Sequence, residues 1–275
     1  MHIQEAKLFD YMVDTHCHLD SQSFADDLEQ VIERSMSKKV HKIIIPGADI
    51  RTLPKAQEIA HQHENVYFAA GVHPNDIDLY DEYVLMQYAK DSKCVAIGEC
   101  GLDYHYLPQK QDDLQDLEND IQAQRDEIKA KQKQCFIAQI ELSIRLNKPL
   151  IVHIREASHD SFALLNEYPN AYGVLHCYNA DRILLGLSER FYYGIGGVCT
   201  FKNARRLLEV LPLIPKERIV LETDAPYLTP HPHRGTRNEP CYIPLVMSQI
   251  AEVLGINEKE VIQISTSNAL ELFNI

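Results

Sequence analysis

The chain has 275 residues, of which 45% are hydrophobic and 24% are charged, and its formal net charge is −13 at pH 7. This is the composition of an ordinary globular protein, and no apolar run approaches the roughly 18 residues that a membrane-spanning helix needs. The net negative charge argues against nonspecific binding of nucleic acid over a broad surface, because such binding depends on clustered Lys and Arg. A local phosphate site stays open, since bound metal ions can supply positive charge.

Two features of the chain favour the cytoplasm. The first eight residues lack both the basic start and the apolar stretch of a secretory signal. The seven cysteines are an odd number without a Cys-x-x-Cys pair, so they indicate neither a closed disulfide framework nor a zinc-knuckle spacing.

Short apolar segments rich in β-branched residues alternate with helical segments along the whole chain. The expected strands are Tyr11–His16, Lys42–Pro46, Val66–Val72, Val95–Glu99, Leu150–His153, Gly173–His176, Tyr192–Gly196 and Arg218–Glu222. Eight such units predict a (β/α)8 TIM barrel that forms a single domain over residues 1–275. The alternative is an open doubly wound sheet, but no Gly-x-Gly-x-x-Gly turn follows the first strand.

One segment between the fourth and fifth expected strands is longer than a barrel helix needs to be. It contains no Gly or Pro from Gln109 to Asn147. Apolar side chains recur there near heptad spacing, at Leu114, Leu117, Ile121, Ile128 and Cys135. The pattern predicts a long helix or a helical hairpin, with an insertion at about 109–134. It would pack on the barrel as an outer helix, or act as a dimerisation or substrate-covering arm.

Ionisable side chains stand at or just after the ends of five expected strands. His16 and His18 are two residues apart, so in an extended chain they project from the same face. The whole set is His16, His18, Glu99, His153, His176 and Asp224. All strands of a barrel open their carboxyl ends onto one face, where catalytic groups gather. Any single one of these residues could be structural, but together they predict a metal centre, and imidazoles mixed with carboxylates suit Zn²⁺, Mn²⁺, Fe or Ni.

The segment Asp14–Asp20, with sequence DTHCHLD, resembles the opening motif of the TatD family of metal-dependent hydrolases. Later blocks resemble that family in the same order, at Gly71–Pro74, Gly98–Tyr104, Pro149–Arg155, Leu175–Tyr178 and Leu221–Tyr227. The resemblance covers nearly the whole chain and implies an amidohydrolase-like TIM barrel with up to two divalent ions. It implies that His16, His18 and Asp224 hold the first ion, that Glu99 bridges both, and that His153 and His176 hold the second.

The resemblance also implies an activity, because family members are associated with deoxyribonuclease action, including 3′-to-5′ exonuclease action. The expected partner is therefore DNA, single-stranded or at a 3′ end, and the expected reaction is attack of a metal-activated water on a phosphodiester. Asp224 and Glu99 are the expected catalytic carboxylates, with Asp224 as general base or proton shuttle. The two ions could be Mg²⁺, Mn²⁺ or Zn²⁺, because an imidazole-rich set does not select Mg²⁺.

Four further residues are expected to face the substrate. His73 could bind or orient a phosphate, and Arg155, two positions after His153, could reach a phosphate oxygen through its planar fork of donors. Arg234 and Arg237 lie in a basic loop over residues 231–240 and could receive the backbone of a nucleic acid. The alternatives are a satisfied core histidine, surface ion pairs and a structural Pro-rich loop.

Two carboxylates beside the expected ligands are expected to support them, and three neighbouring cysteines are expected to have no role at the site. Asp103 is expected to order Glu99, and Glu222, which has the strand parity of Asp224, is expected to support the first ion. Cys17, Cys100 and Cys177 adjoin ligands in sequence, and strand alternation predicts that they point away from the site into the core.

The chain departs from the family pattern at two places near the expected barrel mouth. The connection over residues 109–134 is longer, and Asn179-Ala180 follows His176-Cys177-Tyr178 where relatives more often have a small hydroxyl residue and Gly. Two other classes of function therefore stay open. One is metal-dependent hydrolysis of an amide or ester on the same barrel, and the other is an interaction protein on a degenerate barrel. The oligomeric state is also left open by the sequence.

Overall fold

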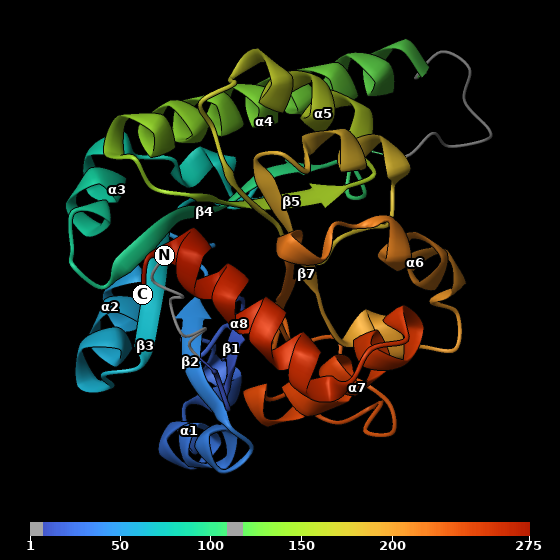
Figure 1. Cartoon of the computed structure of the whole chain (residues 1–275). Coiled ribbons are helices and arrows are strands. Elements are labelled where there is room, and N and C mark those ends of the chain that lie inside the picture. Colours follow the sequence, from blue (N-terminus) through green and yellow to red (C-terminus); the bar gives the residue numbers. More distant parts are fainter. Residues whose placement is uncertain (1–7, 109–117) are drawn as a thin grey trace, which may run out of the picture.

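The computed structural model describes residues 8–108 and 118–275, which form an eight-stranded parallel barrel surrounded by helices (Figure 1). The strands pair in chain order from β1 to β8. They are β1 Met12–Asp14, β2 Val40–Ile45, β3 Val66–Ala70, β4 Cys94–Asp103, β5 Leu150–Arg155, β6 Gly173–Leu175, β7 Phe191–Ile195 and β8 Ile219–Leu221. The first and last strands meet where the Thr15 N–H donates to the Leu221 carbonyl at 3.0 Å. The predicted (β/α)8 fold is confirmed.

The strand ends differ from the expected ones at the positions that carry the site. β1 ends at Asp14, so His16 and His18 lie just beyond it, and between them Cys17 forms an isolated parallel bridge with Ala225. Conversely, β4 runs four residues past Glu99, which lies inside the strand. The pairing of β4 with β5 shifts register between Ile97 and Cys100, and this irregularity lets the strand continue.

The core has two layers separated by the wall of strands. The inner layer takes one small or β-branched side chain from most strands, and Val13, Ile44, Ile151 and Val220 are typical members. Phe273 and its neighbours in the last helix close the end of the barrel where the strands begin. The outer layer packs between strands and helices.

The helices follow the strands around the barrel, and none of those in the described residues combines the length and apolar character needed to cross a membrane. They are α1 Leu28–Ser37, α2 Leu53–Gln62, α3 Glu82–Ala89, α4 Glu118–Leu146, α5 Ser158–Glu167, α6 Arg205–Val210, α7 Ile243–Leu254 and α8 Glu258–Phe273. Gly255 ends α7 with φ at 64°, a left-handed conformation that glycine adopts readily. The side chain of Asn257 then accepts the Glu260 N–H and starts α8.

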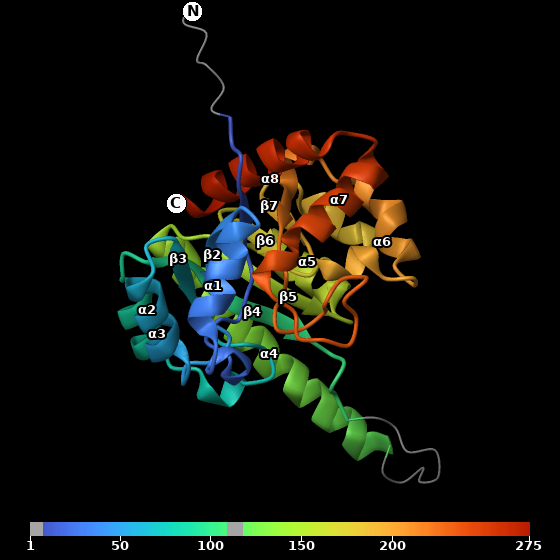
Figure 2. The same cartoon turned by 90° about the horizontal axis from the view of Figure 1, so that it is seen from below.

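Helix α4 has 29 residues, and its first part extends beyond the body of the barrel (Figure 2). Its later part is tied to the barrel by two buried glutamines. Gln132 pairs with the N–H and carbonyl of Asp103, and Gln139 pairs in the same way with Val72. The expected long helix is therefore present from Glu118, whereas Leu114, Leu117 and the rest of 109–117 lie outside the described residues.

Candidate metal centre

Six side chains meet at the carboxyl end of the barrel with Glu99 at their centre, and they are the six that the sequence singled out. Glu99 Oε1 lies 2.9 Å from both His153 Nδ1 and His176 Nε2. Its Oε2 lies 3.3 Å from His16 Nε2 and 4.0 Å from His18 Nε2. Asp224 Oδ1 lies 3.4 Å from His18 Nε2. Glu99 therefore stands between two groups of imidazoles.

The closing seam of the barrel holds His16 and Asp224 together through the backbone. The Asp224 N–H donates to the His16 carbonyl at 2.8 Å. Beneath them the fully buried Asp14 carboxylate accepts from the His16 N–H at 3.2 Å and from the Thr223 hydroxyl at 2.6 Å. Burial raises the pKa of Asp14 to about 7. Asp14 had no expected role, although its strand parity matches that of His16 and His18.

The electrostatics of the cluster favour positive charge between its carboxylates. Burial by itself would raise the pKa of Glu99, but the neighbouring imidazoles of His176 and His16 hold it well below its usual range. Burial would likewise lower the pKa of His18, and its hydrogen bond to Asp224 outweighs that effect and raises the pKa to about 9. The Glu99 and Asp224 carboxylates, whose pKa values are both lowered, are thus anions among imidazoles, which suits a bound cation.

The donor set fits a divalent cation. Both ring nitrogens of His16 are buried without a hydrogen-bond partner, although a buried polar atom normally has one. Donor atoms lie within 4.8 Å of one another in three groups: His16, His18 and Glu99; His73, Glu99 and His153; and His16, His176 and Glu222. Imidazole nitrogens beside anionic oxygens are the ligands that first-row divalent metals take.

One expected supporting residue and one expected substrate residue contact the metal cluster in other ways than expected. Asp103 was expected to order Glu99, but its Oδ2 lies 3.3 Å from His153 Nε2. The register shift in β4 places Asp103 opposite Arg155 on β5, which brings it to His153. His73, expected to face a phosphate, has Nε2 3.6 Å from Glu99 Oε1 and so belongs to a donor group.

Glu222 is fully buried, and it lies on the His176 side of the cluster. Its Oε1 accepts the Cys177 N–H at 2.5 Å and lies 4.0 Å from His176 Nδ1, while its Oε2 has no hydrogen-bond partner. Burial raises the pKa of Glu222 to about 8. The sequence placed it beside the first ion, and its nearest donor neighbours are His16 and His176.

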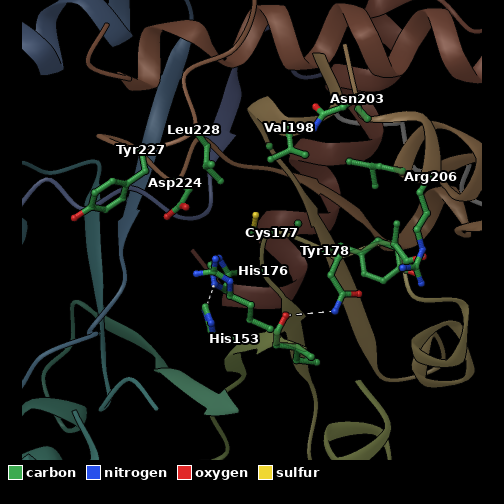
Figure 3. Close-up of a pocket in the computed structure, with 18 residues that line it drawn as sticks. His153, His176, Cys177, Tyr178, Val198, Asn203, Arg206, Asp224, Tyr227 and Leu228 are labelled. Atoms are coloured by element: carbon green, nitrogen blue, oxygen red, sulfur yellow. Dashed lines mark hydrogen bonds between the residues drawn. The ribbon is translucent and has the colours of Figure 1, made fainter. Parts of the chain in front are cut away.

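A pocket of about 510 Å³ opens beside the cluster (Figure 3). His153, His176 and Asp224 lie toward one end of it, and Arg206 lies toward the other. The remaining wall comes from Ile154, Arg155, Cys177, Tyr178, Asn179, Ala180, Gly194, Gly196, Val198, Asn203, Ala204, Leu207, Tyr227 and Leu228. Arg206, on α6, and Asn203, just before it, were not expected from the sequence, because nothing in their local pattern places this segment at the pocket.

The cysteines beside the ligands follow the expectation in two of three cases. Cys17 and Cys100 are buried in the core. Cys177 was expected to do the same but lines the pocket, because β6 ends at Leu175 and Cys177 has φ at 42°, so strand alternation no longer applies. Burial raises the pKa of the Cys177 thiol well above its usual value, which does not favour a thiolate nucleophile.

The three expected substrate arginines have different surroundings. Arg155 is exposed and lines the pocket. Arg234 stacks on Phe201, with 3.9 Å between the guanidinium carbon and the ring centroid. Arg237 donates to Asp27 at 2.7 and 2.8 Å and to Glu239 at 2.7 Å, so the N–H donors of its guanidinium group are already paired with carboxylates. Of the three, Arg155 has the surroundings of a phosphate contact, whereas contacts by the other two remain predictions.

Known proteins resemble the chain over almost its whole length. A family model described as TatD related DNase matches residues 13–274. An uncharacterized metal-dependent hydrolase of Bacillus subtilis is 38% identical and covers 96% of this chain and 99% of its own length. A 3′-5′ ssDNA/RNA exonuclease of Escherichia fergusonii is 32% identical, with coverages of 96% and 99%. A crystal structure of a TatD homolog from Escherichia coli superposes with a TM-score of 0.80 at 27% identity, covering 96% of this chain and 98% of its own.

Proposed function

The chain belongs to the TatD family of metal-dependent hydrolases, and we propose that it is a deoxyribonuclease that hydrolyses phosphodiester bonds of DNA, single-stranded or at a 3′ end. The observation that carries this proposal is the position of Glu99 between two groups of imidazoles at the mouth of the barrel. The name of the exonuclease from Escherichia fergusonii supports the choice of substrate.

Two divalent ions, Mg²⁺, Mn²⁺ or Zn²⁺, would be held by the clustered donors. The first would take His16, His18 and Asp224, and the second would take His153 and His176, with Glu99 shared between them and His73 as a further donor. Such ions supply Lewis acidity, which lets water ionise near neutral pH and offsets the negative charge of a phosphodiester under attack.

The protein's own groups have separate tasks in this reaction. Asp224 lines the pocket with an anionic carboxylate, and Oδ1 lies within 3.4 Å of His18 Nε2, so Oδ2 is the oxygen that accepts a proton from the attacking water. His16 and Glu99 are almost completely buried, so their donor atoms are shielded from bulk solvent. Arg155, on the wall of the pocket, donates to a phosphate oxygen and orients the diester.

The test uses the full chain after removal of metal by chelation and reconstitution with Mg²⁺, Mn²⁺ or Zn²⁺. Substrates are 5′-labelled single-stranded DNA, a blunt duplex, and panels of small amides and carboxyl esters. We expect metal-dependent shortening of the single strand. Hydrolysis of amides or esters without hydrolysis of any phosphodiester would overturn the proposal in favour of the alternative on the same barrel. A metal-loaded protein that hydrolyses none of these would favour an interaction protein.

Two isosteric variants assign the activity to the site. Glu99→Gln and Asp224→Asn should each reduce turnover by at least about 100-fold, because each removes a charge that acts at the reacting centre. Glu33→Gln, an exposed carboxylate on α1, is the matched control and should retain activity. Full turnover with metal retained in Asp224→Asn would refute its role as proton acceptor.

A further inference from the structure

Two tyrosines at the barrel mouth are largely exposed, although most of this protein's large hydrophobic side chains are buried. Tyr106 is 68% exposed and Tyr227 is 58% exposed. Tyr106 follows β4, and Tyr227 follows β8. In a barrel with strands in the order β1 to β8, the ends of β4 and β8 lie on opposite sides of the mouth. The cluster around Glu99 lies between them, and Figure 3 shows Tyr227 beside Asp224.

Tyr106 is held in place by the arginine of the pocket wall. The guanidinium carbon of Arg155 lies 5.2 Å from the centroid of the Tyr106 ring, and Arg155 Nη1 donates to Tyr106 Oη at 3.3 Å. The His105 ring packs against the Tyr106 ring in a T-shaped pair, with 4.9 Å between centroids and 82° between planes. Arg155 forms no ion pair with any residue that the structure describes, so its charge remains available to a ligand next to the ring. A planar ring and a cation without a carboxylate partner among the described residues therefore stand side by side at this edge of the mouth.

Tyr227 is positioned by the residues of the candidate metal centre. Its N–H donates to the Asp224 carbonyl at 2.9 Å, and its carbonyl accepts from Asn238 Nδ2 at 2.6 Å. Its ring lies 5.8 Å from the His18 ring at 74°. The backbone on both sides of the ring is thus tied down, while the ring itself stays more than half exposed. A rigid exposed aromatic surface of this kind costs little entropy when a planar ligand stacks on it.

We propose that Tyr106 and Tyr227 are stacking platforms for the nucleobases on either side of the scissile phosphate, with Arg155 holding that phosphate or its neighbour. This inference rests on the proposed function and narrows its substrate to a strand with unpaired bases, since paired bases are already stacked within their duplex. Stacking also suits a chain with a net charge of −13, because it adds affinity without clustered cations. Any base has a flat face, so the platforms select for single strands and not for sequence.

The experiment crosses tyrosine substitutions with removal of bases from the DNA. The metal-loaded full chain, Tyr106→Ala and Tyr227→Ala are compared on a single-stranded oligonucleotide and on strands with one abasic tetrahydrofuran residue at successive positions. Tyr106→Phe keeps the ring, and Tyr83→Ala removes a tyrosine that is 74% exposed on α3, away from the mouth. Each pair of protein and strand is characterised by its KM and kcat.

We expect each alanine variant to raise the KM for the intact strand by a factor between about 5 and 150, the range typical for alanine substitution of an aromatic residue that stacks on a base. Tyr106→Phe and Tyr83→Ala should keep the KM of the wild type. For each platform, an abasic residue at one particular position should raise the KM of the wild type. On that strand the alanine variant should have the same KM as the wild type, because the base that stacks on the ring is already missing. Equal KM values for wild type and both alanine variants on a strand that the wild type cleaves would overturn this inference alone. A wild type that cleaves none of the strands overturns the proposed function instead.

Discussion

Replacing Gly194 with alanine tests how the floor of the pocket is packed. A Cβ atom at this position would lie 2.0 Å from Glu222 Oε2 and 2.7 Å from its carboxyl carbon. Glu222 is fully buried and its Oε1 is committed to the Cys177 N–H, so the carboxylate has no open space to enter. Overpacking of a buried site costs about 1–3 kcal/mol. With an unfolding entropy of about 2.1 cal/mol/K per residue over 275 residues, that cost lowers the Tm by roughly 2–5 °C.

Calorimetry of the metal-free protein measures this change, and Gly196→Ala provides the matched control. A Cβ at Gly196 meets nothing closer than the Glu222 carbonyl at 3.4 Å, and its φ of −116° suits alanine. Gly194→Ala should also weaken binding of Mn²⁺ or Zn²⁺ by about 10- to 100-fold, since Glu222 faces His176 and such outer contacts orient ligands. If Gly194→Ala has the same Tm as the wild type and binds metal equally well, the described contact between residue 194 and Glu222 is wrong.

Three further predictions concern an ion-pair network, the metal centre and helix α4. Arg237→Ala should lower the Tm most above about pH 4 and progressively less toward pH 2, because Arg237, together with Arg34, lowers the pKa of Asp27 from 3.8 to about 2 and the share of Arg237 in this stabilisation is lost as Asp27 becomes protonated; a difference that is the same across thermal melts from pH 2 to 7 would contradict it. Metal added at 100 times its Kd should raise the free energy of unfolding by about 2.7 kcal/mol, and Glu99→Gln should lose most of that gain in the same titration. Gln139→Leu should cost at least about 1–3 kcal/mol in urea unfolding, because it leaves the buried N–H and carbonyl of Val72 without partners; an unchanged midpoint would show that α4 is not anchored there.

Chain periodicity was sufficient to predict the barrel and the residues that meet at its mouth. The spacing of His16 and His18, and the position of His153 and Asp224 near strand ends, are local properties of the chain. In a parallel barrel such ends share one face whatever the details of packing, and for this reason the six side chains could be expected together. Their contacts with Glu99 in the structure agree with that expectation.

Residues whose surroundings depend on register or on distant partners could not be placed in this way. Asp103 reaches His153 because β4 shifts register against β5, and Cys177 enters the pocket because its backbone turns left-handed after β6. Arg237 pairs with Asp27, which is 210 positions away in the chain. None of these outcomes has a signature in the local sequence.

The fold class and six of the clustered donors could therefore be predicted from the sequence, since both follow from which residues end each βα unit, whereas His73 joined the donors only in the structure. The tertiary structure alone decided how those donors are grouped, which cations remain open to a ligand, and where exposed aromatic rings stand around the mouth. Tyr106 and Tyr227 illustrate the difference: they are 121 positions apart in the chain, and only closure of the barrel sets them on opposite sides of Glu99. The closing of the sheet converts separate strand ends into one site.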